Sequence, residues 1–66
     1  MNPEALLIAI EEFLARTGMK PTRFGIEAAN DPRLVFGLRD GREPRRATAD
    51  RIREYMARMS SMAEAS

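Results

Sequence analysis

The chain contains no cysteine and no histidine among its 66 residues. The absence of cysteine excludes disulfides, and the absence of both excludes a zinc site built on the usual Cys and His ligands. A domain of this length buries only about 60% of the surface that its unfolded chain exposes. Its stability must therefore come from helix packing, alone or together with a second subunit.

Long apolar runs are also missing. No segment approaches the about 20 apolar residues of a membrane span, so we expect no membrane partner. The opening Met-Asn-Pro-Glu is acidic rather than basic, unlike a secretory signal. Both observations favour a cytoplasmic protein.

Signals of enzyme chemistry are absent too. There is no glycine-rich phosphate loop, and Glu11 and Glu12 are neighbours on a solvated helix face rather than a facing pair. We therefore predict no enzyme, no catalytic residue, no metal or cofactor, and no small-molecule ligand.

The net charge of +1 is unevenly distributed along the chain. Residues 20–46 carry seven cations against four acids, whereas residues 1–19 carry one cation against three acids. Ten of the eleven cations are arginine, which suits bidentate contacts to phosphate and guanine better than lysine does. A GC-rich genome explains the preference for arginine equally well, but it does not explain the placement.

Helical periodicity and punctuation predict four helices. The first is expected over about Pro3–Thr17, after the N-cap Asn2, with Gly18 as its C-terminal stop. Its core positions share one helix face. They are Leu6, Leu7, Ile10, Phe13 and Leu14.

The middle of the chain indicates two short helices separated by a tight turn. These helices are expected over about Pro21–Ala29 and Pro32–Arg39, with the break at residues 29–31 and Gly41 after the second. Phe24 and Ala28 are predicted to be buried in the first helix. Val35 and Leu38 are predicted to be buried in the second. Gly25 lies where steeply crossing helices require close backbone approach.

A fourth helix is expected from Ala47 or Thr48 to Met62, after a loop of residues 40–46. Its predicted core stripe is Ile52, Met56, Met59 and Ala63, flanked by Tyr55 and Met62. The predicted organisation is one domain over residues 1–62 and a frayed tail over residues 63–66.

Residues 21–40 resemble the helix-turn-helix of the phage-repressor and Cro-like (XRE) superfamily, as found in small one-domain regulators of alphaproteobacteria and their phages. The resemblance rests on Phe24, Gly25 and Ala28 in the first helix and on Val35 and Leu38 in the second. The loop Gly41-Arg42-Glu43-Pro44 resembles the Gly-Arg-x-Pro loop of that family. In place of the family's usual turn glycine this chain has Ala29, and Asn30 tolerates a left-handed backbone better, which allows a turn shifted by one residue.

The resemblance implies a compact, lambda-repressor-like, all-α domain. It also implies a nucleoid-associated transcriptional regulator, such as a repressor, that binds double-stranded DNA with residues 32–39 in the major groove. On that helix Pro32, Arg33, Phe36 and Gly37 would face the bases, with Arg33 bidentate to guanine. The alternatives are a solvated Arg33 and a Phe36 that packs in the core or on another subunit.

Contacts to phosphate form a separate expected class. The candidates are Lys20, Thr22, Arg23, Arg42, Arg45, Arg46 and Arg51. For Arg39 an ion pair with Glu43 or Glu27 is an equal alternative to a contact with DNA.

A homodimer is expected because one such motif reads few base pairs. Its candidate surface is Tyr55, Met59 and Met62, with Ile8 as an alternative. These residues otherwise close the core of the monomer. A protein-interaction adaptor or anti-repressor with the same fold is the rival function, favoured if Phe36, Ile8 and the methionines dominate the surface.

Overall fold

The protein folds into helices connected by short turns and one loop. The computed structural model describes residues 3–65, except for the side chains of residues 3 and 62–65. In chain order the helices are α1 (Pro3–Thr17), α2 (Pro21–Ala29), α3 (Leu34–Arg39) and α4 (Arg46–Ala65). No strand occurs within residues 3–65. The predicted all-α, four-helix class is therefore confirmed.

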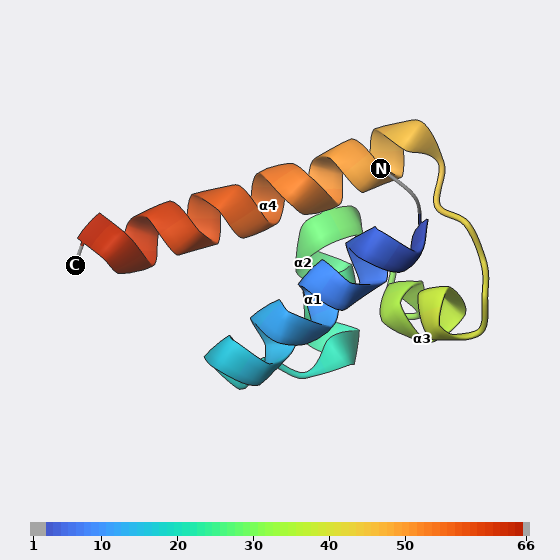
Figure 1. Ribbon diagram of the computed structural model, residues 1–66, viewed down its shortest axis with the longest axis horizontal. Coiled ribbons are helices and arrows are strands. Elements are labelled where there is room, and N and C mark those ends of the chain that lie inside the picture. Colours follow the sequence, from blue (N-terminus) through green and yellow to red (C-terminus); the bar gives the residue numbers. More distant parts are fainter. Residues whose placement is uncertain (1–2, 66) are drawn as a thin grey trace.

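The helices form a body with α4 along one side. α2 packs against both α3 and α4, and α1 packs against α3. The C-terminal end of α4 extends beyond the other helices (Figure 1). The described side chains of α4 that are buried, Ala49, Ile52 and Tyr55, all lie in its first half. The contribution of α4 to the core is thus concentrated near its N-terminus.

Three aromatic rings fill the centre of the core. The rings of Phe13, Phe24 and Tyr55 meet edge to face, with centroids 5.5 to 6.1 Å apart. Edge-to-face contacts place the positive edge of one ring against the negative face of another. These rings therefore join α1, α2 and α4 at one point, on which the aliphatic side chains of Ile10, Val35 and Ile52 also converge.

The observed core differs from the predicted one in three respects. Tyr55 is buried rather than flanking the stripe of α4, because its ring completes the aromatic cluster. Met56 and Met59 are only partly buried against that core. Leu34, which the sequence prediction left out of the core, is buried beside Val35.

The helix limits agree with the sequence for α1 and α2 and differ for α4. Gly18 ends α1 with a φ of 74°, as its position predicts. α4 begins at Arg46, and it extends to Ala65, into the predicted tail of residues 63–66. Fraying of that tail stays a prediction, and the expected N-cap Asn2 lies outside the described residues.

Gly25 allows a close backbone approach between α2 and the turn that follows it. A Cβ atom built on Gly25 would overlap the carbonyl oxygen of Asp31 and lie 3.2 Å from both the Asp31 carbonyl carbon and the Leu34 Cβ. The Asp31 N–H also donates to the Gly25 carbonyl, with an N–O distance of 3.0 Å. Only glycine lets the turn after α2 fold back onto the helix in this way.

We expect Gly25→Ala to lower the free energy of unfolding by about 1–3 kcal/mol, because a backbone carbonyl has to move. Gly37→Ala is the matched control, since a Cβ there meets nothing closer than the flexible Arg42 side chain at 3.4 Å. That variant should gain up to about 1 kcal/mol from helix propensity. Urea denaturation measures both, and equal effects would contradict this account of Gly25.

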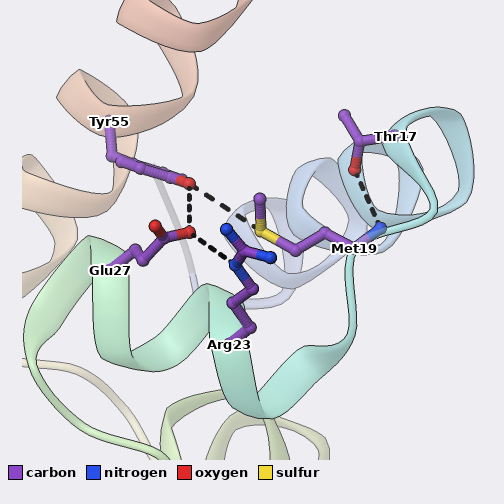
Figure 2. Close-up of polar contacts among 5 residues, drawn as sticks. All are labelled: Thr17, Met19, Arg23, Glu27 and Tyr55. Atoms are coloured by element: carbon purple, nitrogen blue, oxygen red, sulfur yellow. Dashed lines mark hydrogen bonds and ion pairs between the residues drawn. The ribbon is translucent and has the colours of Figure 1, made fainter.

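A polar contact lies at the edge of the aromatic cluster. The Tyr55 hydroxyl of α4 points toward Glu27 and Met19 (Figure 2). It donates to the Glu27 Oε2 at 3.1 Å, and the Met19 Sδ lies 3.7 Å away. The same Glu27 oxygen accepts the Arg23 Nε–H at 3.4 Å. Burial and then the hydrogen bond to Glu27 raise the pKa of Tyr55.

Tyr55→Phe removes this hydrogen bond while keeping the ring. We expect a loss of about 0.5–1.5 kcal/mol in the free energy of unfolding, because the hydroxyl is only partly buried and Glu27 can be solvated. Tyr55→Leu, which also breaks the ring cluster, should cost clearly more in the same denaturation measurement. If the two variants lose the same free energy, the rings contribute nothing specific.

Candidate nucleic-acid interface

The turn between α2 and α3 is built by Asn30 and Asp31. Asn30 has a left-handed backbone with φ 55° and ψ 36°, so the turn is centred one residue after Ala29. Asparagine adopts this conformation at lower cost than alanine does. The alternative of a shifted turn is therefore the one that the structure adopts.

α3 begins two residues later than the sequence predicts, because residues 31–34 form a turn. The Asp31 carbonyl accepts the Leu34 N–H at 3.2 Å, and Arg33 has φ −99° and ψ 4°. Aspartate first, proline second and a third residue near −90°, 0° is the arrangement of a type I turn. The Asp31 Oδ1 also accepts the Arg33 N–H at 3.0 Å. Pro32 and Arg33 therefore lie in this turn and not on α3.

The end of α3 is closed by Gly41. Its φ is 94°, and its N–H donates to the Leu38 carbonyl at 3.1 Å. The Arg42 N–H donates to the Gly37 carbonyl at 2.9 Å, which completes a Schellman motif. This cap turns the chain back along α3 and directs Arg42 toward Gly37.

An open groove of about 330 Å³ lies between α3 and the start of α4. Arginines reach it from the turn and from the loop, namely Arg33, Arg42 and Arg45. None of the three takes part in an ion pair among the described residues. Leu34 and Leu38 form apolar walls of the groove, and the carboxylates of Asp31 and Glu43 also line it. The Asp31 Oδ1 accepts the Arg33 backbone N–H.

The four candidate base contacts occupy different environments. Pro32 and Arg33 are exposed in the turn, and Phe36 on α3 is 47% exposed. Gly37 is half-buried and lines the groove beside Arg42. The exposure of Phe36 removes the alternative in which it belongs to the core.

The phosphate candidates lie in four different environments. Arg42, Arg45 and Arg46 are exposed on or beside the groove, and Lys20 and Thr22 are exposed at the start of α2. Arg23 is paired with Glu27 and is therefore partly neutralised. Arg51 lines a second hollow with Arg58, between α2 and α4.

Arg39 binds Glu11 of α1, and not Glu43 or Glu27 as expected from the sequence. Its Nε and Nη2 donate to the two carboxylate oxygens at 2.8 and 2.7 Å. The hydrogen bond to Arg39, and then the charge of that residue, lower the pKa of Glu11. No sequence signal indicated this pair, since the residues are 28 positions apart.

The candidate dimer residues also separate. Tyr55 is buried in the monomer, which favours the alternative in which it closes the monomer core. Met59 is partly buried against the core, and Ile8 is 55% exposed. The side chain of Met62 lies outside the described residues.

Comparison of the chain with family models, with curated proteins and with solved structures gave no match in any of the three. Within residues 3–65 no helix is long and apolar enough to span a membrane. Among the described side chains, no three or more of histidine, cysteine, aspartate and glutamate lie together in a group that could hold a metal ion.

We predict that the pKa of Glu11 lies below its ordinary value and returns toward it in Arg39→Gln. Because the pKa of Glu11 is lower in the folded state, the pair stabilises the protein fully at pH values above the unfolded-state pKa. This stabilisation is lost as the pH falls through the folded-state pKa. Carboxyl-carbon NMR titration of Glu11 in both proteins measures this. An identical Glu11 titration in the variant would contradict the pairing.

Proposed function

We propose that the protein is a transcriptional regulator that binds double-stranded DNA through the turn before α3, the outer face of α3 and the adjoining groove. The observation that carries the proposal is the convergence of three arginines on one groove beside the exposed Phe36. They are Arg33, Arg42 and Arg45, none of which forms an ion pair with a described residue. The phage-repressor and Cro-like superfamily is the family that this proposal favours.

The charges around this groove support a polyanionic partner. Arginine offers a planar fork of donors that fits phosphate oxygens and the guanine edge. Arg46 adds a further exposed cation at the first position of α4, whose first turn contains no acid. Such a surface attracts the phosphate backbone before any base is read.

Roles follow from position. Arg33 is the proposed guanine contact, because the turn at Asp31 holds it just before α3. Contacts to base edges or methyl groups are proposed for Pro32, Phe36 and Gly37. Arg42, Arg45 and Arg46 are proposed to bind phosphates. Lys20 and Thr22 add a second phosphate contact at the N-terminus of α2, where backbone N–H groups are free of a side-chain cap.

A dimer on two half-sites about 34 Å apart would supply the length of a specific operator. Two surfaces are proposed for this contact, the exposed Ile8 on α1 and the part of α4 that contains the partly buried Met59.

The test is fluorescence anisotropy with the duplex upstream of the protein's own gene and with mixed-sequence duplex, over a range of salt. We expect the upstream duplex to bind about 10³-fold more tightly than mixed sequence. Arg33→Ala should weaken that preference by roughly 5- to 150-fold, the value of one bidentate base contact. Equal binding of both duplexes would contradict sequence-specific regulation from this promoter.

The phosphate contacts are tested by the salt dependence. Arg45→Ala combined with Arg46→Ala should weaken binding to both duplexes and reduce the slope of log K against log salt by about 1.8. Arg58→Ala is a single-cation control, because it removes an exposed cation from the second hollow, which shares no lining residue with the groove, and should leave the slope nearly unchanged. An unchanged slope in the double variant would exclude these two contacts.

A protein-binding adaptor is the second candidate function. It is favoured by three large apolar side chains with about half of their surface exposed, Ile8, Ile26 and Phe36. Failure of the wild-type protein to bind either duplex at low salt would favour this function over the first.

A further inference from the structure

The Glu11–Arg39 pair is the best-formed ion pair in the described part of the chain. The Arg39 Nε donates to the Glu11 Oε2 at 2.8 Å and the Nη2 donates to the Oε1 at 2.7 Å, whereas the other two ion pairs have N–O distances of 3.4 and 3.8 Å. About 40% of each side chain is exposed, so the pair lies on the surface. Exposed pairs usually contribute little to stability, but bidentate geometry makes this one an exception. The pair also fixes where the Arg39 guanidinium lies.

The pair lies at the edge of the proposed DNA-binding face. Arg39 is the last residue of α3, one turn after the exposed Phe36, and its Cζ lies 5.8 Å from the centroid of that ring. A guanidinium at this distance attracts the face of the ring. Glu11 therefore holds Arg39, and Arg39 in turn contacts the Phe36 ring.

We propose that Glu11 withholds Arg39 from the DNA backbone and so limits binding to DNA of any sequence. This inference rests on the proposed function. Without Glu11, an unpaired arginine at the end of α3 would reach the phosphates that flank the groove. With Glu11, that arginine is neutralised and serves as a positioning residue for Phe36, while Arg33, Arg42 and Arg45 supply the contacts.

Two variants that change the net charge equally distinguish this role from a general effect of net charge. Glu12 is the neighbouring acid on α1, is exposed, and forms no ion pair among the described residues. Glu11→Gln and Glu12→Gln remove the same charge from adjacent positions. Only the first variant frees a cation.

The experiment measures binding of mixed-sequence duplex DNA to wild-type protein, both glutamine variants, Arg39→Gln and the double variant Glu11→Gln with Arg39→Gln. In Glu11→Gln we expect two- to tenfold tighter binding and a salt slope steeper by about 0.9, the value of one added phosphate contact. Glu12→Gln and Arg39→Gln should keep the wild-type slope, and the double variant should return to it.

Two results would overturn the inference. The first is an equal salt slope in Glu11→Gln and Glu12→Gln, and the second is a smaller slope in Arg39→Gln, which would mean that Arg39 already binds phosphate in the wild-type protein. Circular dichroism and thermal unfolding of each variant exclude a loss of fold as the cause.

A measurement without DNA tests the pair itself. The Arg39 Nε–H should give a slowly exchanging signal in ¹H–¹⁵N spectra of the wild-type protein and of Glu12→Gln, and this signal should broaden in Glu11→Gln. Equal exchange in all three proteins would contradict the pairing. Failure of the wild-type protein to bind DNA, in contrast, refutes the proposed function and is seen before any variant is compared.

Discussion

The close approach of the Asp31 carbonyl to Gly25 is the constraint on which the candidate site depends. It lets the chain reverse after α2 without a longer loop, because no side chain separates the helix from the turn. The left-handed Asn30 and the type I turn at Asp31–Leu34 follow directly from that reversal. The position of the Arg33 side chain is consequently fixed one residue before α3 begins.

The positions of Arg42 and Arg45 at the groove depend on how α3 ends. The Schellman motif at Gly41 returns the chain along α3, so that Arg42 lies against Gly37 and Arg45 precedes α4. Two short backbone motifs, one at each end of a six-residue helix, thereby bring together three arginines that are up to 12 positions apart. The positive charge at the groove therefore comes from residues in a turn and a loop rather than from one face of a helix.

Local signals in the sequence were sufficient for much of the fold. The limits of α1 and α2, the stop at Gly18 and the close approach at Gly25 were predicted because proline, glycine and apolar spacing act over a few residues. The buried Tyr55 and the Glu11–Arg39 pair were not predicted, since both depend on how distant helices pack. The groove is only partly predictable for a different, local reason. The sequence predicts that α3 begins at Pro32, whereas the Asp31 carbonyl and carboxylate hold residues 31–34 in a turn.

The choice between a nucleic acid and a protein as partner depends on the unpaired charges more than on the exposed apolar side chains. Single exposed isoleucines such as Ile8 and Ile26 are common on monomers and indicate little alone. Several arginines around one groove are a stronger signal, because each like-charged neighbour raises the cost of leaving the group without an anion. Arg39 differs from these arginines, because Glu11 of α1 pairs with it. The arginines that form no ion pair among the described residues therefore favour the proposed nucleic-acid partner over a protein, because an anionic backbone would contact several of them at once.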